Sequence, residues 1–550
     1  MYKLINKNKL IAIVILSFFN MLVACGGGSE SSQSTSSPVN SVVSGTVVIS
    51  GVAIVGQTLT ATHTLSDANG LGTLAFQWHK TNNENTQDID GETNDSYTIL
   101  SIDEGYFLSV TVSYVDGDGF SETITSSQTQ SVINSTEVNV KPNILLIIAD
   151  DQGVDASAQY TYSTDLPHTP TIDELAAQGI VFDNAWATPA CTTTRGTIIT
   201  GMHGVNSGVS FVPAELDSSS FTLQRYIKSL PEASDYQTAV IGKWHLGGGN
   251  PDLSHPTDSG VDYYAGNIAG VIPDYEDWEL TINGSVEQST EYHTSKVTDL
   301  AIDWMSTQEQ QSSPWFLWLA YVAPHFPFHL PPSDLHTRDS LTGTSEHIDA
   351  NRREYYLAAI EAMDTEIGRL LDSMSSAERD NTIVIYIGDN GTPTPVIDRE
   401  VFIGSHGKGS LYEGGIRVPM IVSGKGVERI NERESALVNT SDFFATFGQL
   451  LGGSDFAVND SYSFSDLLIG NGSGLRSYNY SEFESNDVTG WTVRNNDYKL
   501  IEFADATQEL YYLTEDLAEE NQLIGAEGDY QAIIDELSAY ASLVRGELNN

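Results

Sequence analysis

Cysteine is almost absent from this chain: 550 residues contain two, Cys25 and Cys191. Two cysteines allow one pairing, and each lies in a motif that uses a cysteine for itself, so the sequence excludes a disulfide framework. Cys25 ends Leu22-Val23-Ala24-Cys25, directly after an apolar run. Cys191 opens a segment, Cys-Thr-Thr-Thr-Arg-Gly, that is typical of a helix start. We therefore expect the two cysteines to serve separate purposes.

Basic residues are also scarce. Lysine and arginine number 25 against 74 aspartates and glutamates, which gives a formal net charge of −49. A charge of this sign repels polyanions, so we expect no nucleic-acid partner. Because dissolved salt screens self-repulsion, the composition suits a salty environment.

Long hydrophobic runs are missing beyond the first residues. Lys3, Lys7 and Lys9 precede an apolar run from Leu10 to Leu22 that is too short for a membrane-spanning helix and is typical of a secretory signal. The four residues ending at Cys25 form a lipobox. Residues 1–25 are therefore predicted to be a lipoprotein signal peptide that is cleaved before Cys25, and the cysteine sulfur is predicted to carry lipid.

The predicted lipid on Cys25 indicates where the protein is located. Residues 26–41 are rich in glycine and serine and are predicted to form a flexible linker. No later segment reaches the ~20 apolar residues of a spanning helix. The residue directly after the lipidated cysteine is Gly26, whereas the signal that retains lipoproteins at the inner membrane is an aspartate at this position. We expect a lipid anchor in the cell envelope, at the outer membrane.

Residues 42–137 show short alternating runs between Gly, Asn and Asp turns, which predict an all-β sandwich. The runs are Thr58–Thr62, Ala75–Trp78, Tyr97–Leu100 and Leu108–Tyr114. Trp78, in the middle of a run, is the expected centre of the core. Val55-Gly56-Gln57-Thr58-Leu59 and Phe76-Gln77-Trp78 resemble the immunoglobulin-like modules of bacterial surface proteins. Such a module is a spacer or, as an alternative, a carbohydrate-binding unit.

The pattern changes after Val140, where wholly apolar runs alternate with helix-like segments. The apolar runs are Ile144–Ala149, Ala239–Gly242, Trp315–Val322 and Thr382–Ile387, and the helical segments are Ile172–Gln178, Leu223–Leu230, Val297–Met305 and Tyr355–Met374. Buried strands interleaved with helices predict an α/β domain over residues 138–455, with a central, mostly parallel sheet sandwiched by helices. Residues 456–550 are predicted to form a small α+β subdomain that closes with a helix over Tyr530–Arg545.

Polar side chains follow each predicted buried strand. Because ligands bind at the carboxyl ends of strands in open α/β sheets, these groups are expected to meet in one site with Cys191. Any one of them alone fits a turn or a surface position equally well, but their recurrence at successive strand ends favours a site. The groups are Asp150 and Asp151, Lys243 and His245, His325, and Asp389 and Asn390, and Lys408 lies in a later loop.

These side chains divide into two chemical sets. Asp150, Asp151, Asp389 and Asn390 offer hard oxygen ligands, which suit calcium or magnesium better than zinc. Five further groups are cationic or carry protons and suit an anion with several oxygens: Arg195, Lys243, His245, His325 and Lys408. Arg195 lies four residues after Cys191 and therefore on the same helical face. The combination predicts hydrolysis of a sulfate or phosphate ester.

From Lys141 onward the chain resembles the formylglycine-dependent (type I) sulfatase family of the alkaline-phosphatase-like superfamily. The motifs that carry the resemblance are Pro142-Asn143-Ile144 through Asp151-Gln152-Gly153, Cys191 to Gly201, Gly242-Lys243-Trp244-His245-Leu246-Gly247, Asp389-Asn390-Gly391, and Gly407-Lys408-Gly409 through Pro419. Tyr498-Lys499-Leu500 and Glu509-Leu510-Tyr511 resemble the small C-terminal subdomain of that family.

The resemblance implies a role for each residue. Cys191 is oxidised to formylglycine by a formylglycine-generating maturation enzyme, and the hydrate attacks sulfur. Arg195 and Lys243 hold the formylglycine and the sulfate, while His245 takes a proton as the sulfated intermediate collapses. His325 and Lys408 bind sulfate, and one of them protonates the leaving alcohol. One calcium ion is held by the four oxygen donors Asp150, Asp151, Asp389 and Asn390.

The resemblance also implies a sulfated carbohydrate substrate. Two alternatives stay open: a phosphate or phosphonate monoester hydrolase on the same scaffold, and a surface-binding lipoprotein without catalysis. Thr193 stands where the maturation motif of the family usually has proline, and Gly388 stands where serine is more usual. Candidate substrate selectors lie between the motifs: Tyr263, Tyr264, Tyr275, Trp278, His329, Arg338, Arg352 and Arg353. The aromatic ones suit stacking on sugar rings, and core packing is the commoner use of such residues.

Overall fold

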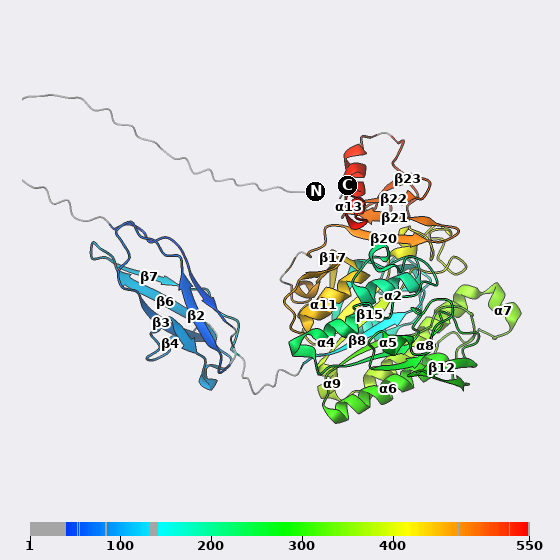
Figure 1. Ribbon diagram of the computed structural model, residues 1–550, viewed down its shortest axis with the longest axis horizontal. Coiled ribbons are helices and arrows are strands. Elements are labelled where there is room, and N and C mark those ends of the chain that lie inside the picture. The colour runs from blue at the N-terminus through cyan, green and yellow to red at the C-terminus, as the bar shows by residue number, and fades with distance from the viewer. Residues whose placement is uncertain are drawn as a thin grey trace, which may run out of the picture. The chain divides into compact units, whose positions relative to one another are not determined.

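The computed structural model describes residues 40–547 apart from 52, 54, 83, 84, 133–140, 471, 473 and 527. The chain divides into two compact units, Met1–Asn139 and Val140–Asn550 (Figure 1). Cys25, the signal peptide and most of the linker lie outside the described residues. Within the described part, no helix has the length and apolar character needed to cross a membrane.

The described part of the first unit contains two antiparallel sheets and a short 3-10 turn, η1(Ser101–Asp103) (Figure 1). The first sheet has the order β1(Val47–Ser50), β2(Thr58–His63), β5(Ser96–Thr98), and the second has the order β4(Asn85–Asp88), β3(Ala75–Asn82), β6(Phe107–Val115), β7(Ser121–Thr125). Trp78 is fully buried between them, with its ring 5.7 Å from that of Tyr97. The alternating pattern therefore predicts both the strand content and the core residue of this unit.

The second unit is built on one large mixed sheet. Its strand order is β13(Ser285–Ser289), β12(Trp278–Ile282), β11(Tyr263–Gly266), β10(Gln237–Gly242), β14(Trp315–Ala320), β8(Asn143–Ala149), β15(Thr382–Gly388), β16(Met420–Gly424), β9(Gly179–Trp186), β17(Glu432–Asn439). β12 and β16 run opposite to the other strands. The prediction of a mostly parallel sheet holds at its centre, whereas β16 is antiparallel because the chain between β15 and β16 stays at the carboxyl end of β15 and must run back.

The helices predicted from periodicity are present, with ends that differ by a few residues. The α-helices of the described second unit are α1(Pro170–Ala177), α2(Cys191–Thr200), α3(Gly204–Ser207), α4(Leu223–Ser229), α5(His255–Asp258), α6(His293–Gln311), α7(Ser345–Ala350), α8(Arg352–Ser373), α9(Ser376–Asp380), α10(Glu413–Ile416), α11(Phe443–Leu450), α12(Ser465–Leu468) and α13(Gln531–Val544). Two short strands, β18(Ala457–Val458) and β19(Ser461–Tyr462), pair with each other.

Helices cover both faces of the large sheet (Figure 1). Alternate residues of β8 enter two different cores on the two faces. One core holds Ile144, Leu146 and Ile148 with side chains of α2, α4 and α11, and the other holds Leu145, Ile147 and Ala149 with side chains of α1, α6 and α8. Every residue of β8 is buried. A strand that is apolar on both faces is therefore buried on both faces, as predicted.

The C-terminal subdomain is a four-stranded antiparallel sheet that packs against α13. Its order is β20(Asn479–Glu484), β21(Thr489–Arg494), β22(Tyr498–Phe503), β23(Gln508–Tyr512), and the α+β prediction is confirmed. Lys499 of β22 lies with its Nζ 2.7 Å from Glu519 Oε1 and 3.2 Å from Glu413 Oε1, and all three side chains are buried. Because Glu413 begins α10, this ion-pair network fixes the subdomain to the segment that follows Lys408.

Candidate active site

The strand ends converge because their registers keep them level. Gly242 of β10 pairs with Ala320 of β14, Ala320 is level with Ile148 of β8, and Ala149 pairs with Gly388 of β15. Gly242 has φ 101°, and a Cβ there would lie 1.9 Å from the Ala320 carbonyl oxygen, so only glycine fits this turn. The residues that follow each strand therefore enter the same space.

Direct contacts join all the site residues that the sequence predicts. Cys191 is the first residue of α2, and its Sγ lies 3.3 Å from His245 Nδ1. Asp151 donates its backbone N–H to Asp389 Oδ1 over 3.0 Å, and its side chain accepts from Asn390 Nδ2 over 2.9 Å. The remaining members join through ion pairs: Asp150, Arg195, Lys243, His325 and Lys408.

Each buried carboxylate has a cationic partner. Lys243 Nζ pairs with Asp150 Oδ2, and Arg195 Nη2 lies 2.8 Å from Asp389 Oδ2; all four side chains are fully buried. Lys408 pairs with Asp151 Oδ1. An unpaired charge in such a place would cost several kcal/mol, and these pairs offset part of that cost. Burial still raises the pKa of Asp150 to about 8, although Lys243 opposes the rise.

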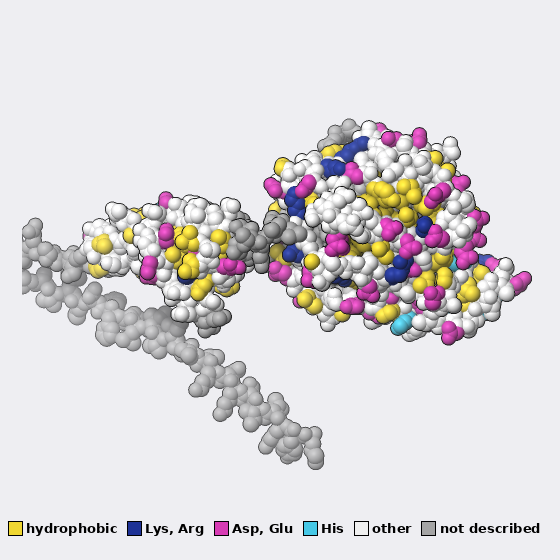
Figure 2. Space-filling model, turned by 90° about the horizontal axis from the view of Figure 1, so that it is seen from below, with side chains coloured by type: hydrophobic (Ala, Val, Ile, Leu, Met, Phe, Trp, Pro, Cys, Tyr) yellow, Lys and Arg dark blue, Asp and Glu magenta, His cyan; other side chains and the backbone are white. Residues whose placement is uncertain are grey.

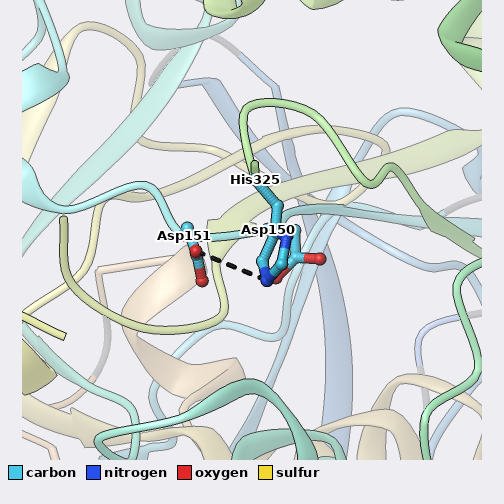
Figure 3. Close-up of side chains that lie close together, drawn as sticks. All are labelled: Asp150, Asp151 and His325. Carbon is cyan, nitrogen blue, oxygen red and sulfur yellow. Dashed lines mark ion pairs between the residues drawn. The ribbon is translucent and has the colours of Figure 1, made fainter. Parts of the chain in front are cut away.

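Three oxygens in the site have no hydrogen-bond partner among the described residues: Asp150 Oδ1, Asp151 Oδ2 and Asn390 Oδ1. Figure 3 shows the Asp150, Asp151 and His325 side chains lying close together, with Asp151 Oδ2 3.7 Å from His325 Nε2. Buried oxygens normally have partners, and three hard oxygens left free in one place fit a hard divalent cation. Three of the four predicted oxygen ligands thus have an oxygen without a hydrogen-bond partner, whereas Asp389 accepts through both of its oxygens, from the Asp151 N–H and from Arg195.

Burial sets the protonation of the groups around Cys191. It raises the pKa of the Cys191 thiol, and Lys243 and Lys408 only partly oppose it. Burial also lowers the pKa of His245 well below its usual value, and neighbouring Lys243 and Arg195 lower it further. The pKa of His325 falls to about 3, chiefly through burial. The free site therefore holds a neutral thiol beside neutral imidazoles.

Two site residues adopt left-handed backbone conformations, Asp151 with φ 72° and His245 with φ 58°. A left-handed conformation in a residue other than glycine costs ~1–3 kcal/mol, and it persists where the surrounding contacts stabilise it. The Asp151 carbonyl accepts from Tyr356 OH over 2.8 Å. A Cβ at Gly270 would lie 2.1 Å from His245 Nε2, so glycine there leaves room for the imidazole.

Two supports of the site were not predicted from the sequence. Trp244 lies between Lys243 and His245, and its indole N–H donates to His255 Nδ1 over 3.0 Å. Tyr275, a candidate substrate selector, donates its hydroxyl to the His325 carbonyl over 2.7 Å. Each contact joins residues from separate segments, so no local signal identifies it.

The site opens into a cavity of about 610 Å³. None of the selector residues proposed from the sequence is among the described residues that line it. Tyr264, Tyr275 and Trp278 are buried in the protein core, and Arg338 and Arg353 form ion pairs with neighbouring carboxylates. The cavity is lined by Ala190, Cys191, Val212, Pro213, His245, Gly248, Gly249, Pro251, Ala269, Gly270, Val271, His325, Phe326, Lys408, Gly409 and Phe483.

Comparison with protein families gives two matches. A family model described as Sulfatase matches residues 142–453, and one described as N-sulphoglucosamine sulphohydrolase, C-terminal, matches residues 403–545. The N-acetylgalactosamine-6-sulfatase of Rattus norvegicus is 26% identical over 344 residues, which cover 56% of this chain and 62% of that protein. The Ulvan-active sulfatase of Formosa agariphila is 28% identical over 345 residues, covering 60% of this chain and 64% of that protein.

A solved structure has the same fold. The crystal structure of Ps i-CgsB in complex with k-i-k-neocarrahexaose matches with a TM-score of 0.64 at 23% identity, over 74% of this chain and 93% of that chain. The chain spans 62% and 64% of the length of the two curated relatives above.

The buried Lys243–Asp150 pair generates a stability prediction. Lys243→Met leaves the buried Asp150 without its cationic partner, and should lower the free energy of unfolding by up to ~3–5 kcal/mol in the presence of a chelator. Lys243→Met combined with Asp150→Asn removes both charges and should recover most of the loss. Urea unfolding of the single and double variants measures both effects. A double variant no more stable than Lys243→Met would contradict the role assigned to the pair.

Proposed function

The chain belongs to the sulfatase family, and from that premise we propose that it hydrolyses a sulfate ester, on a sulfated carbohydrate. One observation carries the proposal: three buried oxygens without a hydrogen-bond partner in the described part of the chain lie among five groups that suit an anion, next to a cysteine at a helix start. The helix N-terminus adds partial positive charge beside the bound anion. Membership of the family favours a sulfate ester over the phosphate or phosphonate alternative.

Formylglycine made from Cys191 would supply, as its hydrate, the hydroxyl that attacks sulfur. His245 is neutral and contacts residue 191, so it is placed to accept a proton there. Arg195 donates to the Lys243 carbonyl over 2.8 Å and to Asp389, which holds the guanidinium beside the start of α2. Positioning and proton transfer in this scheme therefore rest on side chains held by the buried ion pairs.

Lys408 and His325 have different roles: Lys408 binds the sulfate, and His325 acts on the leaving group. Burial would lower the pKa of Lys408, but Asp151 outweighs it and raises the pKa above its ordinary value, so Lys408 stays cationic and binds sulfate. His325 loses its charge in the free site, and a bound sulfate would favour its protonation. We assign protonation of the leaving alcohol to His325.

We propose one calcium ion as the cation, held by Asp150, Asp151, Asp389 and Asn390. The ion would balance negative charge on the sulfate. Four oxygen donors leave room for further oxygens among the six to eight that calcium takes. All four donors lie buried, and three of them have the free oxygens described above.

Formation of formylglycine requires a maturation enzyme as a partner. Cys191 and Thr193 are buried within α2, and Thr193 Oγ1 donates to the Ala190 carbonyl over 2.8 Å. An enzyme that reads this segment in extended form has no access to it once α2 has packed. We propose that conversion of Cys191 precedes folding of the second unit.

We further propose that lipid on Cys25 anchors the protein in the cell envelope, at the outer membrane, and that the first unit is an immunoglobulin-like spacer. The signal-like segment and lipobox support the anchor. Two antiparallel sheets around Trp78 support the spacer.

Replacing the proposed nucleophile tests the function. Cys191→Ala should lower the rate of sulfate ester hydrolysis by roughly a thousandfold or more, because no hydroxyl remains to attack sulfur. The proteins are produced together with a maturation enzyme and assayed on matched sulfate and phosphate esters. Cys25→Ala is the control, because it makes the same cysteine-to-alanine change outside the site. Activity of Cys191→Ala within about tenfold of wild type would refute the nucleophile, and faster turnover of the phosphates would favour the alternative hydrolase.

Calcium should stabilise the protein. At about one hundred times its Kd, it should raise the free energy of unfolding by ~2.7 kcal/mol, and Asp150→Asn should remove most of this gain. Asp349→Asn makes the same change at an exposed carboxylate and should keep the gain. Thermal unfolding with and without chelator, together with metal analysis, measures the effect. Stoichiometric zinc in place of calcium would contradict the oxygen-ligand assignment.

Substitution of Cys25 tests the proposed lipid anchor. Cys25→Ala should move the protein from the membrane fraction to the soluble fraction without loss of activity, since no lipid can be attached. Cys191→Ala should stay in the membrane fraction. Continued membrane association of Cys25→Ala would show that another part of the protein does the anchoring.

A further inference from the structure

The wall of the active-site cavity differs in character from its floor. The described residues that line the cavity include four with polar side chains, which we call its floor, and we call the remaining lining residues its wall. The four are Cys191, His245, His325 and Lys408. Every other described lining side chain is apolar or is glycine. The alcohol part of a substrate therefore meets apolar side chains and backbone once it leaves the sulfate-binding groups.

Three large side chains of this wall are exposed: Phe326, Val271 and Val212, at 51%, 49% and 40%. The Phe326 ring stacks on His325, with the ring centres 4.4 Å apart and an angle of 26° between the planes. An aromatic face beside the imidazole is placed to contact the leaving group that His325 serves. Such faces suit the C–H surface of a sugar ring, which is apolar on one side.

The described part of the wall offers no cation for a second anionic group. Lys408 on the floor is already paired with Asp151, and no other Lys or Arg is among the described lining residues. An ionised group placed against an apolar wall loses hydration without gaining a partner. The chain as a whole carries a net charge of −49, and Figure 2 shows acidic side chains spread over the face of the second unit that it presents.

We propose that this site selects sugars that carry one sulfate, at the scissile position, and that it discriminates against sugars with a second sulfate on the neighbouring carbon. The proposal rests on the proposed function, because it takes the floor of the cavity to bind the scissile sulfate. The discrimination comes from the wall, with Phe326 and Val271 contacting the uncharged ring.

The test uses matched pairs of methyl galactosides, one pair for each ring position. One member carries a single sulfate, and the other carries the same sulfate with a second on the adjacent carbon. Binding is measured by calorimetry on the full chain bearing Cys191→Ala, so that the ranking does not depend on turnover. In the best-bound pair, the singly sulfated member should bind about tenfold more tightly, which corresponds to ~1.4 kcal/mol.

A cation added to the wall should reverse the preference. Val271→Arg in the same background should improve binding of the doubly sulfated sugar relative to its partner by about tenfold, because the guanidinium pairs with the second sulfate. Val286→Arg is the control: Val286 lies on β13, is 51% exposed and does not line the cavity. It adds the same charge to the protein and should leave the ratio unchanged.

The outcomes separate the two proposals. Equal or tighter binding of the doubly sulfated sugars by the protein with an unaltered wall would overturn the inference, and so would equal effects of Val271→Arg and Val286→Arg. Tighter binding of an aryl sulfate than of every sugar would replace the sugar with an aromatic leaving group and also overturn it. Correct ranking in binding without hydrolysis by the matured protein would instead refute the proposed function and leave the selectivity standing.

Discussion

The burial of opposite charges at the ends of the central strands is the constraint on which the site depends. Asp150, Asp151 and Asp389 are buried, and each has a cationic partner from another part of the chain. Because an unpaired buried charge costs several kcal/mol, the fold and the site have to form together. The pairs use one oxygen of Asp150 and one of Asp151, and among the described residues the other oxygen of each has no hydrogen-bond partner.

The site is also held by segments that contribute no group to it. Lys499 and Glu519 of the C-terminal part bind Glu413, which follows the Lys408 loop in the chain. Tyr275 holds the carbonyl of His325, and His255 accepts the indole N–H of Trp244. These contacts connect the insertions and the C-terminal subdomain to the positions of the site's side chains, so that changes far from the cavity can alter its geometry.

The sequence predicts the local parts of this structure well. A fully apolar run such as Ile144–Ala149 identifies a strand buried on both faces, and the polar residues after it identify the edge where ligands bind. The antiparallel course of β16 escaped prediction because it depends on where the intervening loop lies. Tyr275 and Trp278 illustrate a second limit: an aromatic in an insertion fits either a core or a binding surface, and here both are buried. Phe326, which does line the cavity, carries no pattern that sets it apart.

The mass of the peptide that contains Cys191 tests the central claim most directly, because the account makes that residue the source of the nucleophile. Protein is prepared with different amounts of a maturation enzyme, and the fraction of aldehyde at residue 191 is compared with the rate of sulfate ester hydrolysis. We expect the rate to rise in proportion to the aldehyde fraction and to vanish with it. Full activity in a preparation whose residue 191 is an unmodified thiol throughout would contradict it.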